Sequence, residues 1–563
     1  MATVGQPSSF QTGMTPMSGD TASTPDITGS VPNSQRPTEK SQEPGNSGVP
    51  RGQAENEEYP PTYVALTIMA SCLISIFLVS LDRTIVSTAI PYITDEFQSI
   101  NDIGWYGCAY MLANCAVQLL YGKIYKLYSV KNVFFGAIII FEVGSVLCGA
   151  APTSKALIIG GAIAGAGSSG VMSGVMQIMV HTVPLAKRPI YSGLFSSVFG
   201  ISSVVGPLLG GAFTERVSWR WCFYINLPFG AVSIVAVFFL MKAPPAHQRR
   251  LPFKERLDQL DPIGLLLFIP CIVCLILALQ WGGVVYSWSN ARIIVLWVVF
   301  GITLIIWIAV QAWKKDNATV PPRAFFQRSI LASFSFAITV ASSMIILVYY
   351  VPLWFQAVKG VSPVKSGLTF LPFVLALVVA AIIGGLLTQR IGYYVPTMPN
   401  TGHPRWIGLQ VLCGFGIGIG MQQANLAAQT VLPRPDVPVG IALMFFAQQL
   451  GGAIFLAVGQ SVFTHGLING LTGVNELNPG KVAEAGATQI RNMVPESLLP
   501  KVLAAYNIAL TQTWYISVGL MCASIVPTLC MEWKNIKRKE GTGKPQTRGT
   551  SVRCDSDRPD YPT

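Results

Sequence analysis

Charged side chains are scarce in this sequence. Asp, Glu, Lys and Arg make up 11% of its 563 residues, whereas hydrophobic residues make up 51%. Soluble globular proteins carry about 25% charged residues, and the mean hydropathy of +0.50 is high. This deficit excludes an ordinary soluble domain and predicts a multi-pass membrane protein embedded in a lipid bilayer.

Motifs for nucleotide and metal chemistry are also missing. There are only four histidines, none in a metal-ligand spacing, and no phosphate-binding Gly-x-x-x-x-Gly-Lys-Ser/Thr motif occurs. That excludes an ATP-driven pump acting on its own. Several of the eleven cysteines lie inside apolar stretches, where they are expected to pack as small apolar side chains. We therefore expect no enzymatic activity, no cofactor and no metal, and an ion gradient as the energy source.

The net charge of +12 does not indicate a nucleic-acid partner. Its basic residues fall mostly in short loops and in the C-terminal tail, and no module of basic and aromatic residues accompanies them. Basic loops are typical of the cytoplasmic side of membrane proteins. Residues 1–58 are rich in Ser, Thr, Pro, Gly and Gln, and this composition predicts a disordered cytoplasmic tail.

Thirteen apolar segments are long enough to span a bilayer, at about 20 residues for roughly 30 Å. With the N-terminus inside, the basic clusters fall in cytoplasmic loops through the tenth segment. The segments are 63–84, 103–124, 132–152, 155–180, 191–213, 221–242, 261–281, 292–313, 329–353, 366–388, 406–424, 437–463 and 508–531.

The end of the chain conflicts with this count. Residues 532–548 carry six Lys/Arg against two Glu and favour the cytoplasm, yet thirteen alternating spans would place them outside. A span within 389–405 would remove the conflict, but this interval has three prolines and no apolar run. Either the topology of the second half is irregular or the sequence lacks one helix.

Glycine and proline are concentrated in residues 191–213. Gly206 and Gly210 lie four residues apart, so a neighbouring backbone can come close to that helix face. Pro207 removes one backbone donor and can bend the helix, and Gly211 follows directly. A bent, closely packed helix suits a bundle that rocks during transport.

Ionisable residues within apolar segments are candidates for proton coupling, because a buried charge is costly unless it is paired or functional. Asp82 and Arg83 end the first segment, and Glu142 lies midway along the third. Asp82 can take up and release a proton, or it can cap or pair locally near the membrane face. Glu142 has the alternative of a structural carboxylate that pairs with a neighbouring helix.

Amide and aromatic side chains are candidates for a substrate cavity. Such a cavity suits bulky amphipathic organic molecules better than sugars or phosphates. Each residue has the alternative role of helix packing or interfacial anchoring. The candidates are Gln118, Gln177, Tyr349, Tyr350, Gln356, Gln448 and Gln449.

A series of motifs over about residues 60–540 resembles the major facilitator superfamily, in particular its 14-spanner drug:proton antiporters and their fungal toxin and multidrug efflux branch. The motifs are LDRTIVSTAIPYIT (81–94), WYGCAYML (105–112), GKIYKLYSVKNVF (122–134), GAIAGAGSSGVMSG (161–174), GPLLGG (206–211), WRWCFYINLPFG (219–230), LDPIG (260–264), YYVPLWFQAVKGVSPVKSGLTFLP (349–372), IGYYVP (391–396), DVPVGIALMFFAQQLGGAIF (436–455) and EWKNIK (532–537).

The resemblance implies an all-α major facilitator fold, with two six-helix halves and two linking helices. The expected parts are an N-terminal half in 59–242, a loop and linking helices in 243–314, a C-terminal half in 315–531 and a basic cytoplasmic tail in 532–563.

The same resemblance implies a monomeric, proton-coupled exporter of a toxin, secondary metabolite or drug-like molecule, in the plasma membrane or the vacuolar membrane. Uptake of a siderophore or another organic solute is a second interpretation. An inactive or sensor membrane protein is a third.

Three departures from the family pattern stand out. The fourth-helix motif has Gly161 where the family usually has an arginine implicated in proton movement. Lys126 replaces the usual aspartate of the loop between the second and third helices. The motifs IGYYVP and TGHPRWIG, between which similar proteins have the eleventh span, are nearly fused. The missing helix is either a gene-model fault or a real truncation.

Overall fold

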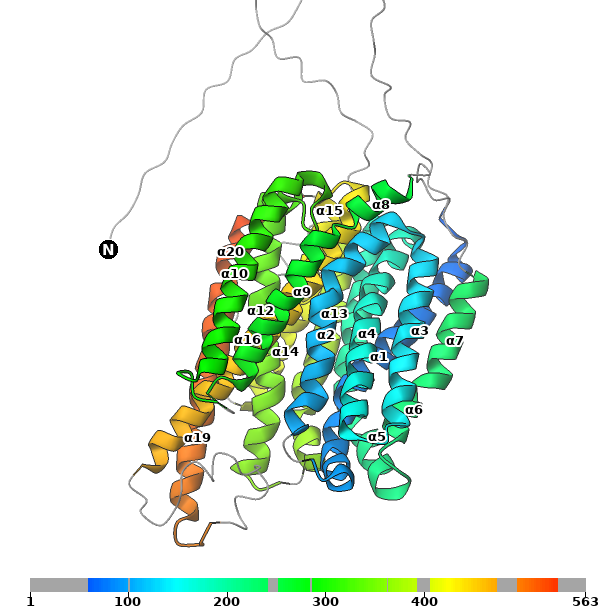
Figure 1. Ribbon diagram of the computed structural model, residues 1–563. Coiled ribbons are helices and arrows are strands. Elements are labelled where there is room, and N and C mark those ends of the chain that lie inside the picture. Colours follow the sequence, from blue (N-terminus) through cyan, green and yellow to red (C-terminus); the bar gives the residue numbers. More distant parts are fainter. Residues whose placement is uncertain are drawn as a thin grey trace, which may run out of the picture. The chain divides into compact units, whose positions relative to one another are not determined.

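Long helices make up the computed structural model, which describes residues 59–99, 102–240, 252–283, 286–361, 363–391, 406–472 and 494–534. These ranges contain helices and no strand, which confirms the all-α class. The long helices run close to a common axis (Figure 1).

The helix bounds follow the predicted apolar segments. The first group is α1 (Thr62–Phe97), α2 (Ile103–Leu127), α3 (Val130–Gly149), α4 (Ser154–Thr182), α5 (Arg188–Arg216), α6 (Trp221–Tyr224) and α7 (Asn226–Leu240). The linking group is α8 (Phe253–Gln259), α9 (Pro262–Trp281), α10 (Ala291–Lys314) and α11 (Pro322–Phe325). The last group is α12 (Arg328–Ala357), α13 (Pro363–Ile391), α14 (Trp406–Gly420), α15 (Gln423–Val431), α16 (Val437–Leu471), α19 (Leu499–Ala523) and α20 (Ile525–Cys530).

Eleven helices in the described ranges are long and apolar enough to cross a membrane. Helices also lie at the two other predicted segments, but these do not meet the same criteria. Polar residues lower the hydropathy of α2, and α14 has only 15 residues. Multi-pass character is therefore confirmed, while the count of thirteen spans stays a prediction.

The first and last groups of helices share one packing pattern. In the first group, α1 packs against α5 and α7, and α2 packs against α4. In the last group, α12 packs against α16 and α19, and α13 packs against α14. The groups meet where α5 packs on α13 and α2 packs on α16. Two similar halves therefore join along two seams.

Among the described helices of the last group, none is the counterpart of α3. It packs on α4 and α7. Helix α14 takes the place of α4 in the second half, and its side chains Val411 and Phe415 are exposed. The interval in which an eleventh span is expected includes residues 392–405, which lie outside the described residues.

Helices α13 and α14 run in the same direction, although they follow one another in the chain. Gly414 of α14 abuts the carbonyl of Phe373, and Gly418 abuts that of Leu377, so both numbers rise together. The regular alternation of spans therefore breaks between these two helices, as the irregular topology anticipated.

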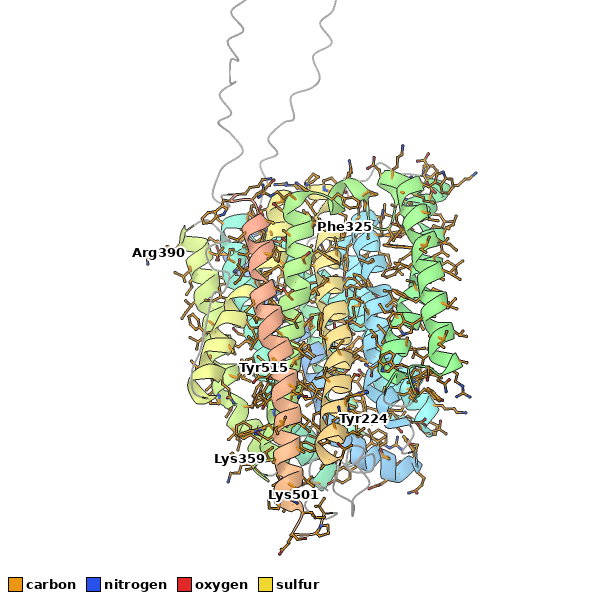
Figure 2. The ribbon with its side chains drawn as sticks, turned by 90° about the vertical axis from the view of Figure 1, so that its left-hand side faces the viewer. Tyr224, Phe325, Lys359, Arg390, Lys501 and Tyr515 are labelled. Carbon is orange, nitrogen blue, oxygen red and sulfur yellow. The ribbon has the colours of Figure 1, made fainter. Side chains whose placement is uncertain are left out.

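The last described residues lie at the end of the bundle from which α12 starts. The Arg328 guanidinium donates from Nε to the Cys530 carbonyl at 2.7 Å, and the Glu532 amide donates to the Ser329 hydroxyl at 3.3 Å. In Figure 2, Phe325 and Arg390 lie at this end, and Lys359 and Lys501 at the other. The break between α13 and α14 thus reconciles the span count with the basic tail.

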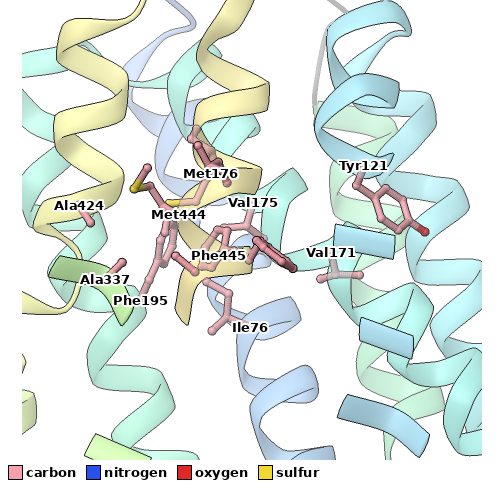
Figure 3. Close-up of a cluster of buried hydrophobic side chains, with 14 of the residues drawn as sticks. Ile76, Tyr121, Val171, Val175, Met176, Phe195, Ala337, Ala424, Met444 and Phe445 are labelled. Atoms are coloured by element: carbon pink, nitrogen blue, oxygen red, sulfur yellow. The ribbon is translucent and has the colours of Figure 1, made fainter. Parts of the chain in front are cut away.

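Apolar side chains from both halves form one continuous core. Val175 and Met176 of α4 and Phe195 of α5 belong to the same buried cluster as Met444 and Phe445 of α16 (Figure 3). At this level the space between the halves is filled by side chains.

The topology can be tested by site-directed labelling of single cysteines in a background without the exposed Cys522 and Cys530 and without Cys554 of the C-terminal tail. Cysteines replacing Lys187 and Lys534 should react with a membrane-impermeant maleimide from one side. Cysteines replacing Lys359 and Lys501 should react only from the other side. Labelling of positions 187 and 534 from opposite sides would contradict the arrangement.

Candidate functional site

Asp82 lies in a buried polar cluster within the first half. Its carboxylate accepts a hydrogen bond from the Asn226 amide at 2.9 Å, and the same amide nitrogen donates to the Ser145 hydroxyl at 3.1 Å. All three side chains are at most 4% exposed. The cluster joins α1, α3 and α7, so a change in the charge of Asp82 acts on three helices at once.

Glu142 is on α3, one helical turn before Ser145. Both of its carboxyl oxygens are buried and have no hydrogen-bond partner among the described residues, and they lie against Gly230 of α7. The charges of Glu142 and Asp82 are close enough to interact. An ionised carboxylate without partners is costly to bury, and this cost falls when the group takes up a proton.

Arg83 points away from the Asp82 cluster, toward the other half. With its amide oxygen facing Arg83, Gln449 of α16 accepts from both terminal nitrogens, at 2.9 and 3.2 Å. The guanidinium carbon also lies 5.6 Å from the centre of the Tyr110 ring on α2. Asp82 is therefore bonded inside the first half, whereas the adjacent Arg83 contacts the second half at the boundary between the halves.

The GPLLGG segment packs on the same part of α1. Gly206 and Gly210 abut the hydroxyls of Thr84 and Thr88, whereas a side chain at Gly211 would meet open space. The Thr84 hydroxyl also donates to the Ser202 carbonyl at 3.0 Å. Pro207 lies inside α5 without ending it. The close approach of α1 and α5 therefore depends on Gly206 and Gly210.

The two amide candidates of the first half lie inside it. Gln118 donates to the Ser173 hydroxyl and accepts from that of Ser169, both at 2.6 Å, so it joins α2 to α4. Gln177 is 1% exposed, and its amide nitrogen has no partner among the described residues. On the same helix as Gln177, Gly161 has space, because a Cβ there would meet only the Tyr106 carbonyl, at 4.0 Å.

The candidates of the second half lie at separate places. Tyr350 is fully buried and donates to the Gln460 amide oxygen at 3.4 Å, whereas the neighbouring Tyr349 is 51% exposed. Gln356 donates to the Ser366 hydroxyl at 2.9 Å, and Gln448 donates to the Met421 carbonyl at 3.4 Å. Of these candidates, only Gln449 contacts Arg83 in the described residues. The substrate role of every candidate stays a prediction.

Opposite charges connect the halves at one end of the bundle, here named the charged end. Asp436, at the start of α16, pairs with Lys126 of α2 at 2.7 Å and with Arg323 at 3.1 Å. Lys123 donates to the carbonyl of Asn317 at 3.2 Å. Both seams are tight here, because Gly122 abuts α16 and Gly193 abuts α13. The halves are therefore in contact at the charged end.

Sequence reasoning missed Asn226 and Asp436. Asn226 stands in the otherwise apolar run CFYINLPFG, and an amide in such a run is a signal for a buried partner. Asp436 lies 310 positions from its partner Lys126 in the sequence. The pair is recognisable only in the structure, where α2 and α16 lie side by side. Lys126, at the usual aspartate position, pairs with a carboxylate from the other half.

Two similar helical halves that pack on each other along two seams are an arrangement found in secondary transporters of the membrane. The chain belongs to the Major Facilitator Superfamily, whose family model matches residues 72–456. Its relatives place it in the fungal efflux branch of this family.

The MFS-type transporter VdtG of Byssochlamys spectabilis is 48% identical over 88% of this chain and 92% of its own length. The MFS-type efflux pump MFS1 of Arthroderma benhamiae is 48% identical over 85% of this chain and 92% of its own length. The crystal structure of the human organic anion transporter MFSD10 shares the fold, with a TM-score of 0.51 and 13% identity. The match covers 84% of this chain and 100% of that chain.

The role of the glycine contact can be tested with Gly206→Ala and the matched control Gly211→Ala. Both changes improve helix propensity equally, but only the first places a methyl group against Thr84. We expect Gly206→Ala to be less stable than the control by about 1–3 kcal/mol, the usual cost of overpacking. The measurement is the thermal unfolding midpoint of the purified protein, and equal midpoints would contradict the contact.

The charged end can be tested with Asp436→Asn, with Glu255→Gln as the control. Asp436 pairs with Lys126 of the other half, whereas Glu255 lies at an exposed position of α8. Hydrogen bonds to charged groups contribute about 1.5–3 kcal/mol each, so Asp436→Asn should make a cysteine replacing the buried Ser192 react at least about tenfold faster with a maleimide. An unchanged rate would show that these pairs do not hold the end closed.

Proposed function

We propose that this transporter exports a toxin, secondary metabolite or drug-like organic molecule in exchange for protons, by alternating access. The observation that carries the proposal is the divergence of two consecutive charges. Asp82 is bonded within its own half, and Arg83 reaches Gln449 of the opposite half. One proton at Asp82 is thereby linked to a contact between the halves.

The proton-binding step is assigned to Asp82, with Glu142 as a second carboxyl in the same region. When Asp82 is ionised, it balances the adjacent guanidinium charge and accepts from Asn226. When it is protonated, this balance is lost, and Arg83 must find negative charge or acceptor oxygens elsewhere. The contact of Arg83 with the other half then changes in strength.

The movement is assigned to the two seams between the halves. Contacts at the charged end hold that side together, and opening that end requires the pairs of Asp436 to separate. Because α1 and α5 are joined through Thr84, they are expected to move as one unit. Rocking therefore takes place along α5 with α13 and α2 with α16.

An inactive or sensor protein is the alternative suggested by the absent helix. This alternative is less favoured because of the position that the missing helix would take in the packing pattern. The helix without a counterpart, α3, makes its contacts inside the first half, whereas α2, α5, α13 and α16, which meet between the halves, are all present. Loss of a peripheral helix is compatible with a complete pathway.

Export is preferred to uptake of a siderophore or other solute because relatives at 48% identity bear the name efflux pump. A plasma-membrane location and a monomeric state complete the proposal, with the vacuolar membrane as the second location.

The proposal can be tested in membrane vesicles with an imposed pH gradient and a panel of fluorescent aromatic compounds of neutral, cationic and anionic charge. Gradient-driven extrusion of at least one compound is expected, and an uncoupler should abolish it. Asp82→Asn should lower the rate at least about tenfold, because it removes the proton acceptor. Glu255→Gln, a change at an exposed position of α8, is the matched control.

Extrusion that survives the uncoupler but stops without ATP would overturn the proton coupling. A chain that inserts correctly but moves no compound in the panel would favour the inactive protein.

A further inference from the structure

Arg83 is a half-buried cation whose hydrogen-bond acceptor, Gln449, and aromatic neighbour, Tyr110, are both neutral. In the described part of the chain it forms no ion pair, and its Nε hydrogen has no acceptor. Asp82 beside it is already bonded to Asn226. A guanidinium inside a membrane bundle normally has a carboxylate partner or a function. In the described residues, no carboxylate accepts a hydrogen bond from Arg83, so its donors need an explanation.

The side chains around Arg83 have the chemistry to bind a flat ligand that has a polar edge. The guanidinium presents a planar fork of N–H donors that matches a carboxylate. The Tyr110 ring beside it adds an aromatic surface, and aromatic rings stack favourably on such a surface. Tyr110 belongs to α2 and Gln449 to α16, so the place lies on a seam between the halves.

The Gln449 amide oxygen occupies the position of a ligand oxygen. It accepts from the two terminal nitrogens of Arg83, as one carboxylate would. A carboxylate can pair with a guanidinium through two parallel hydrogen bonds and carries the opposite charge, which a neutral amide oxygen lacks. A carboxylate or phenolate entering from the pathway would therefore displace Gln449, and the contact between the halves would be released.

We propose that Arg83, Tyr110 and Gln449 form a substrate subsite for an aromatic molecule that carries an anionic oxygen, a carboxylate or phenolate. Arg83 binds the oxygen, Tyr110 contacts the ring system, and Gln449 competes for the guanidinium until substrate arrives. The assignment rests on the proposed transport function, and it specifies the substrate class that this function leaves open.

The test is equilibrium binding to the purified full-length protein in detergent, followed by quenching of tryptophan fluorescence, so no gradient is needed. The probes are anthraquinone-2-carboxylate and its methyl ester, which differ by one charge. The wild type should bind the carboxylate at least about tenfold more tightly than the ester. Arg83→Gln should reduce this preference to less than about twofold, and Arg83→Lys, which keeps the charge but not the fork, should retain an intermediate preference.

Gln449→Leu separates a subsite from a structural role. Removal of the competing oxygen should strengthen carboxylate binding by at least about threefold and leave ester binding unchanged, whereas Gln460→Leu, elsewhere on α16, should change neither. Equal affinities for the two probes, no binding of either, or weaker binding of both in Gln449→Leu would overturn the assignment. Selective binding combined with absent gradient-driven extrusion would refute the proposed coupling and leave the subsite intact.

Discussion

Close approach of helix backbones is the constraint on which this bundle depends. Lipid provides no apolar driving force between helices, so association depends on packing and on polar contacts. In α4, Gly167 abuts the backbone of Phe141, and Gly165 abuts that of Tyr110. The α1 to α5 contact and both seams use glycine in the same way. The described bundle is therefore closely packed both inside each half and along the seams.

Dense packing determines where polar groups are accommodated. Asp82, Asn226 and Ser145 occupy a joint of three helices, and Gln118 joins α2 to α4, so these hydrogen bonds lie inside one half. Arg83 and Asp436 instead reach across the boundary. The polar contacts of the bundle thus divide into those that hold a half together and those that hold the halves to each other. In the proposed alternating-access cycle, only the second kind must break.

The helices were predictable because their apolar runs are long and continuous, and helices appear at every predicted segment. Asp82 was predictable as a buried acid for the same reason. Its partner was not, because an Asn in an apolar run does not indicate which helix it faces. The contact between Lys126 and Asp436 depends on the packing of α2 on α16, and no local pattern encodes such a distant pairing. The substrate candidates were chosen by residue type, and residue type does not specify whether a glutamine faces a neighbouring serine, as Gln118 does, or a cation, as Gln449 does.

The parallel order of α13 and α14 has a consequence for biosynthesis. Segments that enter the membrane in turn normally adopt opposite orientations, so the orientation of one determines that of the next. When two successive helices run in the same direction, the orientation of the second does not follow from that of the first. Flanking charges must then place them individually, and Arg390 at the end of α13 and the basic residues after α19 can do so by remaining in the cytoplasm. For this chain, insertion of the second half is therefore expected to depend on a few cations more than on the number of its hydrophobic segments.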